Sequence, residues 1–207
     1  MNNPTVNAGT LALAIVVVAL VSGHVGAQTL AGSELVAALR KGGYVIVVRH
    51  TQSPREAPDE RTANPDNSTR ERQLDEGGRA DAMAMGKAMR ELRIPIGTVL
   101  TSPTYRARET VRLAQWEKAV VVPELGDRGQ SMQGVTEVDG AWLRNRVAQF
   151  PTGTDTIIVT HLPNITRAFP QDAPGIEDGD ALVFGRNSQS ASTVVGRIKI
   201  SEWPSLK

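Results

Sequence analysis

Five side chains suited to phosphoryl chemistry each follow an apolar run, either directly or within a few residues: Arg49, His50, Arg106, Glu124 and His161. A guanidinium group matches phosphate oxygens with a planar fork and stays charged at any working pH. A neutral imidazole is a nucleophile at phosphorus, and a second imidazole can donate hydrogen bonds to the equatorial oxygens as charge develops. A carboxylic acid can protonate a departing alkoxide. The set predicts phosphoryl transfer through a phosphohistidine, without a metal.

These residues need elements that carry them to one place, and the sequence predicts a suitable alternation of strands and helices. Candidate strands cover residues 44–48, 98–101, 119–122, 156–160, 181–184 and 194–200. Candidate helices cover residues 32–41, 76–92, 104–116, 138–150 and a short stretch at 164–169. This alternation is typical of a three-layer α/β fold, in which a mostly parallel central sheet has helices on both faces. The apolar runs VIVV and TIIV fit strands buried on both sides.

The carboxyl edge of the predicted sheet is the expected place for a site, because ligands bind there in open α/β sheets. Arg49 and His50 follow one predicted strand, His161 follows another, and Arg106 lies on the first turn of the helix after a third. Considered alone, each residue has a simpler explanation. Arg49 and His50 could be a solvated strand end, His161 a core histidine and Arg106 a surface helix residue. Their joint placement favours a shared site.

The composition argues against several other kinds of protein. There are no cysteines, which rules out thiol nucleophiles, disulfides and thiolate metal sites. A net charge of +1 and 4% aromatic residues argue against a nucleic-acid partner. Only three histidines occur, none at HExxH spacing, and neither a G-x-S-x-G motif nor a glycine-rich phosphate loop after the first strand is present. We therefore expect no metal and no cofactor.

The N-terminus predicts export. The 12-residue apolar run from Thr10 to Val21 is short for a membrane span but has the length of a signal-peptide core. The small residues at 25–27, Val-Gly-Ala, predict cleavage after Ala27. We expect a signal peptide over 1–27, one domain over 28–207, a periplasmic or secreted location, and no stable membrane association after cleavage. An uncleaved anchor or a buried helix is the alternative.

Two long polar connections, 52–73 and 123–137, are candidate walls of the site, because long loops in compact domains are often functional. Plain surface loops are the alternative. The first connection carries five acidic residues and four arginines, namely Arg55, Arg61, Arg70 and Arg72. A solvated loop is the simpler interpretation of this charge, and extra phosphates or acidic groups on a substrate are the other.

Four motifs, in order, resemble those of the histidine phosphatase superfamily, also called phosphoglycerate mutase-like: VVRHT (47–51), QLDEGGRADA (73–82), TSPTYRARET (101–110) and IVTHLPNI (158–165). The resemblance spans about residues 44–185 and implies a phosphoglycerate mutase-like fold. It also implies His50 as the phosphorylated nucleophile, Arg49 and Arg106 as phosphate ligands, and His161 as the second histidine. Thr51 stands where the family usually has glycine.

The family's acid often lies in a Leu-x-Glu segment after the third strand, and VVPELGDRGQ places Glu124 in a similar position without the family's Trp-Glu-Gly. Glu124 is therefore the expected general acid, with Asp127 and the carboxylates of 52–73 as competitors. We also expect Thr51 and Asn164 to contact substrate. The small size and the export signal resemble bacterial periplasmic members of the family.

Together these features predict a metal-independent phosphomonoesterase that acts on a small phosphorylated substrate through a phosphohistidine on His50. The alternatives are a phosphoglycerate-type mutase and a non-catalytic module that binds phosphorylated ligands.

Overall fold

The computed structural model describes Met1, residues 29–128 and residues 134–207. The predicted signal peptide over 1–27 thus lies, apart from Met1, outside the described residues. Within 29–128 and 134–207, no helix has the length and apolar character needed to cross a membrane.

A six-stranded sheet in the order β3-β2-β4-β1-β5-β6 forms the centre of the fold. Its strands are β1 (Val45–Arg49), β2 (Ile96–Thr101), β3 (Val120–Val121), β4 (Asp155–Thr160), β5 (Ala181–Arg186) and β6 (Ser192–Ile198). The first four are parallel to one another, whereas β5 is antiparallel to both of its neighbours, β1 and β6. The prediction of a mostly parallel sheet is confirmed.

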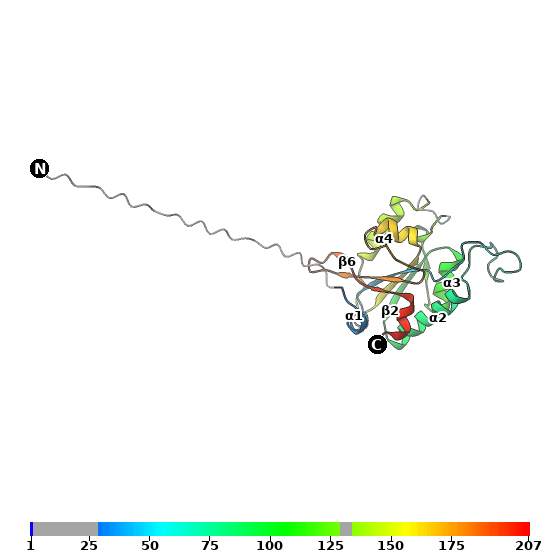
Figure 1. The fold of residues 1–207 in the computed structure, drawn as a ribbon, viewed down its shortest axis with the longest axis horizontal. Coiled ribbons are helices and arrows are strands. Elements are labelled where there is room, and N and C mark those ends of the chain that lie inside the picture. The colour runs from blue at the N-terminus through cyan, green and yellow to red at the C-terminus, as the bar shows by residue number, and fades with distance from the viewer. Residues whose placement is uncertain (2–28, 129–133) are drawn as a thin grey trace.

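Helices cover both faces of this sheet, as predicted, and α4 lies on the opposite side from α1 and α2 (Figure 1). The helices are α1 (Gly32–Leu39), α2 (Glu76–Glu91), α3 (Tyr105–Leu113), α4 (Glu137–Val147) and α5 (Leu162–Ala168), with 3₁₀ turns η1 (Pro123–Leu125) and η2 (Ile200–Ser205). The sequence analysis did not predict the two 3₁₀ turns.

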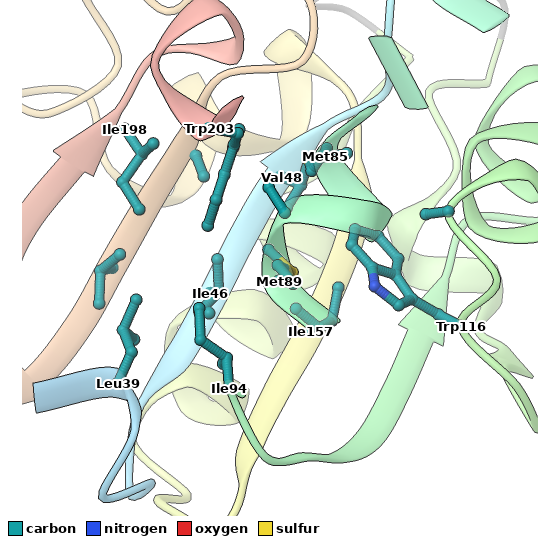
Figure 2. Close-up of a cluster of buried hydrophobic side chains, with 14 of the residues drawn as sticks. Leu39, Ile46, Val48, Met85, Met89, Ile94, Trp116, Ile157, Ile198 and Trp203 are labelled. Carbon is teal, nitrogen blue, oxygen red and sulfur yellow. The ribbon is translucent and has the colours of Figure 1, made fainter. Parts of the chain in front are cut away.

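The alternation of side chains along β1 divides the core into two layers, since successive residues of a strand face opposite ways. Ile46 and Val48 pack with α1, α2, α3 and η2, and this cluster includes Met89 and Trp203 (Figure 2). Val45 and Val47 pack instead with α4 and α5. A strand buried on both faces is held firmly, so the residues that follow it have a fixed position.

The start of α2 supports the chain that leaves β1. Asp75 is the N-cap of α2, as its place after the buried Leu74 suggests, and its carboxylate accepts a hydrogen bond from the amide of Gly78 at 2.7 Å. A Cβ at Gly78 would lie 2.1 Å from the carbonyl oxygen of Gln52, so only glycine fits without a shift. The first turn of α2 therefore packs directly against the backbone two residues beyond His50.

Candidate active site

The structure brings both histidines to the carboxyl edge of the sheet. β1 and β4 are parallel neighbours in which Arg49 pairs with Thr160, so His50 and His161 follow side by side. Their rings meet edge to face, with centroids 5.1 Å apart and planes at 62°. Both side chains are almost fully buried. The strand order, rather than any local spacing in the sequence, creates this pair.

Arg106 joins the two histidines. It lies on the first turn of α3, immediately beyond β2, and is 3% exposed. Its Nε donates to Nε2 of His50 at 3.1 Å, and one Nη donates to Nδ1 of His161 at 3.1 Å. The same Nη is ion-paired with Asp127. One guanidinium therefore contacts both imidazoles and a carboxylate, which is the position from which it could hold a phosphoryl group between them.

The hydrogen bonds of His50 fix its tautomer. Nδ1 lies 2.8 Å from the carbonyl oxygen of Thr51, and because a carbonyl can only accept, Nδ1 must carry the proton. The lone pair is then on Nε2, which faces Arg106. Burial, followed by the charge of Arg106, lowers the pKa of His50 to about 3. At neutral pH, His50 presents a neutral nucleophilic nitrogen to the pocket.

His161 is held in a complementary way. Its Nε2 lies 2.8 Å from the hydroxyl of Ser102 and 3.2 Å from that of Thr104, while Nδ1 faces Arg106. Burial, and then the proximity of His50 and Arg106, hold the pKa of His161 well below its usual value. A phosphoryl dianion beside it would favour the protonated form. His161 could then donate from Nδ1 to a phosphoryl oxygen.

Arg49 is oriented by a residue that the sequence analysis missed. Its Nη2 lies 2.6 Å from Oδ1 of Asp178, and its Nη1 donates to the carbonyl of Ile176 at 2.9 Å. Burial raises the pKa of Asp178. Asp178 lies just before β5, and because β5 is antiparallel to β1, the segment entering β5 reaches the edge where β1 ends. Expecting an antiparallel strand there would have indicated this residue.

The structure places three other predicted site residues differently from Arg49, His50, Arg106 and His161. Thr51 is buried, and its hydroxyl lies 3.2 Å from that of Thr110 on α3. Asn164 donates to the carbonyls of Glu124 and Gly126, both at 3.1 Å, and so supports the η1 turn. Glu124 is half-buried in that turn and lines neither cavity described below. The structure therefore gives Thr51 and Asn164 internal contacts and does not bring Glu124 to the histidines.

Asp127, three residues beyond Glu124, reaches the site instead. It is 4% exposed, ion-paired with Arg106, and its Oδ2 lies 3.7 Å from Nδ1 of His161. Asp127 follows the η1 turn closely, and its carboxylate points to Arg106. Of the carboxylates that the sequence left in competition, Asp127 is the one in contact with this cluster.

A cavity of about 430 Å³ opens over these residues and is lined by the ionisable side chains Arg49, His50, Arg55, Arg72, Arg106, Asp127 and His161. An adjoining cavity of about 560 Å³ shares Arg72, Arg106 and Asp127 with it. The connection 52–73 thus contributes to the site wall, as predicted. Across the described part of the chain, no group of three or more histidine, cysteine, aspartate or glutamate residues is placed to hold a metal ion.

The 52–73 connection has no regular secondary structure but is fixed to α3. Asn64 donates to Oε1 of Glu109 at 3.0 Å, and the amide of Leu74 donates to Oε2 of the same carboxylate at 3.2 Å. Tyr105 donates to Asp66. Glu109 is 3% exposed, so its hydrogen bond with the amide of Leu74 is shielded from water. The loop and the helix that carries Arg106 are therefore joined by buried polar contacts.

Comparison with known proteins agrees with this picture. The family model "Histidine phosphatase superfamily (branch 1)" matches residues 45–129. No curated protein sequence matches the chain. Among solved structures, the protein histidine phosphatase SixA complexed with tungstate is similar at TM-score 0.56 and 17% identity, covering 77% of this chain and 98% of that one.

Two further structures have the same fold. A putative phosphohistidine phosphatase SixA from Agrobacterium tumefaciens has TM-score 0.52 and 16% identity, covering 76% of this chain and 99% of its own. A phosphoserine phosphatase mutant from Entamoeba histolytica, in complex with phosphoserine, has TM-score 0.53 and 8% identity, covering 76% and 97%. At such identities, the likeness concerns the fold.

The mixed six-stranded sheet, the helices on both faces and the histidines at its carboxyl edge define a protein of the phosphoglycerate mutase-like fold. Residues 45–129 match the model of the histidine phosphatase superfamily (branch 1), in agreement with the resemblance indicated by the sequence motifs.

Proposed function

We propose that the protein is a metal-independent phosphomonoester hydrolase that forms a phosphohistidine on Nε2 of His50. The observation that carries this proposal is the geometry at Nε2: a neutral, buried nitrogen lies 3.1 Å from the Arg106 guanidinium, in a cavity that also holds Arg49 and His161. The superfamily match supports a phosphatase of small phosphorylated substrates.

The reaction has two steps. Nε2 of His50 attacks phosphorus in line, the P–O bond to the leaving group breaks, and the departing alkoxide takes a proton. Arg49 and Arg106, with His161 once it is protonated, hold the phosphoryl oxygens as charge develops on them. Water then attacks the phosphohistidine, the P–N bond breaks, and inorganic phosphate leaves. A mutase would instead return the phosphoryl group to a second hydroxyl.

Asp127 is our proposed proton donor, in place of the expected Glu124. A phosphoryl dianion that binds Arg106 competes with Asp127 for the guanidinium. The carboxyl group so released lies beside His161 and can take up the proton needed by the leaving group. Glu124 lines neither cavity.

Leaving-group dependence tests this assignment. Alkoxides need a proton to depart, whereas p-nitrophenolate does not. Asp127→Asn is therefore expected to slow phosphorylation of His50 by ethyl phosphate by about 10²- to 10⁴-fold, and by p-nitrophenyl phosphate much less. Single-turnover rates with both esters provide the measurement, and Glu124→Gln is the matched control.

An equal loss with both esters in Asp127→Asn would mean that Asp127 only orients Arg106. A leaving-group-dependent loss in Glu124→Gln would restore the sequence-based assignment.

The fate of the phosphoenzyme decides the reaction class. Release of inorganic phosphate to water supports the hydrolase, transfer to an added alcohol supports a mutase, and absence of any phosphoenzyme supports a binding module. Phosphohistidine and phosphoserine belong in the substrate screen, since two of the similar structures are named for them.

We also propose export to the periplasm or medium, supported by the apolar run and the Val-Gly-Ala sequence at 25–27. Mass spectrometry of the native protein is expected to find Gln28 as the first residue. An intact N-terminus in the membrane fraction would replace the signal peptide with an anchor.

A further inference from the structure

The cavity over His50 contains two more guanidinium groups than the transfer of one phosphoryl group uses. Arg49 comes from the end of β1 and Arg106 from the first turn of α3, and both line the cavity with the histidines. Arg55 and Arg72 come from the 52–73 connection and line the same cavity. Arg72 also lines the adjoining cavity, where the remainder of a substrate would extend from the reacting phosphate.

Backbone contacts fix the position of Arg72. Its Nη2 donates to the carbonyl of Ser53 at 2.8 Å, and its Nε donates to the carbonyl of Pro54. The side chain is half-buried. Two hydrogen bonds from one guanidinium to adjacent carbonyls limit its rotation, so the group is held at the cavity wall. Arg55 is exposed on the same loop.

Electrostatic coupling indicates that Arg72 lies close to the reacting centre. Burial lowers the pKa of Arg72; the carboxylates of Asp178 and Asp127 oppose this effect, while Arg49 and Arg55 add to it. Arg72 in turn contributes to the lowered pKa of both histidines. Such mutual effects require short separations, since charges interact weakly through water beyond about 10 Å.

The charge balance of the cavity leaves room for a second anion. Asp127 is ion-paired with Arg106, and Asp178 is ion-paired with Arg49. In the adjoining cavity, Glu71 and Arg128 add one charge of each sign. The four arginines that line the cavity over His50 therefore outnumber the carboxylates of Asp127 and Asp178. Clustered like charges raise the energy of the empty site, and an anionic ligand relieves that repulsion.

We propose that Arg55 and Arg72 form a second anion subsite, and that the preferred substrate carries an acidic group, a carboxylate or a further phosphate, a few atoms from the phosphate that is transferred. This inference rests on the proposed function for the identity of the transferred group. The loop arginines would select the substrate, while Arg49, Arg106 and the histidines act on the reacting phosphate.

The test compares esters that differ only in the second group. One pair is 3-phosphoglycerate with glycerol 3-phosphate, and the other is propane-1,3-diol bisphosphate with 3-hydroxypropyl phosphate. The wild-type protein is expected to show kcat/KM at least about 10-fold higher for the acidic member of at least one pair, as expected for a charge-assisted contact. Which pair responds identifies the acidic group as carboxylate or phosphate.

Variants of the loop arginines assign the preference to the subsite. Arg72→Gln and Arg55→Gln are each expected to reduce the acidic-to-neutral ratio by about 5- to 50-fold. Any general effect on catalysis cancels in this ratio. Arg70→Gln is the matched control, because Arg70 belongs to the same loop, pairs with Glu60 at 3.2 Å and lines neither cavity. Its ratio should equal that of the wild type.

Two results would overturn the inference: no acidic preference in either pair, or a preference that persists in both Arg55→Gln and Arg72→Gln. Failure of the proposed function looks different, since no ester, including p-nitrophenyl phosphate, would then yield a phosphoenzyme. Calorimetric binding of the same four esters to His50→Ala tests the subsite without turnover. Tighter binding of the acidic esters that is lost in the Arg72→Gln background supports it, and equal binding of acidic and neutral esters overturns it.

Discussion

Replacing His50 with alanine is expected to abolish turnover and to remove an acid-labile phosphoenzyme. The reason is that our proposal assigns the nucleophilic nitrogen to Nε2 of His50, which lies 3.1 Å from Nε of Arg106, and assigns His161 to hold the phosphoryl oxygens. Rapid acid quench after mixing with a labelled ester, followed by mapping of the phosphorylated residue, provides the measurement. EDTA is expected to leave wild-type turnover intact.

A phosphoenzyme that persists in His50→Ala would contradict the assignment and direct attention to His161.

The protonation state of His50 offers a second check. Because burial and Arg106 lower the pKa of His50 to about 3, its ring should stay neutral as the pH falls from 7 to 5. NMR titration of the ligand-free protein, with His50→Ala to assign the signal, tests this. An imidazole at position 50 that titrates near its ordinary value of about 6.5 would mean that it is more exposed to water than we infer.

Arg106→Ala is expected to lower kcat/KM by about 100- to 1,000-fold, the effect typical of removing one preorganised donor to the transition state. Its planar group contacts both histidines and Asp127. Arg106→Lys should recover only part of the activity, because an ammonium cannot reproduce the fork. Steady-state kinetics on the purified variants provide the measurement.

Arg108→Ala is the control for Arg106, since Arg108 lies on the same helix with an exposed side chain. It is expected to retain wild-type kinetics. Full activity in Arg106→Lys would mean that position 106 supplies only diffuse positive charge. Equal losses in Arg108→Ala and Arg106→Ala would mean that the helix as a whole, rather than its first turn, is sensitive to substitution.

The histidine pair could be predicted from the sequence because it depends only on where the buried parallel strands end. Buried parallel strands give continuous apolar runs, and their carboxyl ends meet at one edge. Arg49, His50 and His161 follow such runs directly, so locating the strands located these residues. Arg106 could be placed for the same reason, since the helix carrying it starts just beyond β2.

Other parts of the site depend on geometry that the sequence does not reveal. Asp178 became part of it only through the antiparallel direction of β5. The 3₁₀ turn after β3 rotates the chain so that Asp127, not Glu124, faces inward. Thr51 and Asn164 are short polar residues that can point to a ligand or to the protein, and the choice depends on distant partners, Thr110 and the carbonyls of the η1 turn.

The buried contacts between the 52–73 loop and α3 have a kinetic consequence. Because Glu109 holds Asn64 and the amide of Leu74, this part of the loop is already attached to the helix that carries Arg106 before any ligand arrives. Association then carries little entropic penalty for ordering the loop. Competing esters should enter at similar rates and differ mainly in residence time. Selectivity in such a pocket is decided by how long a ligand stays.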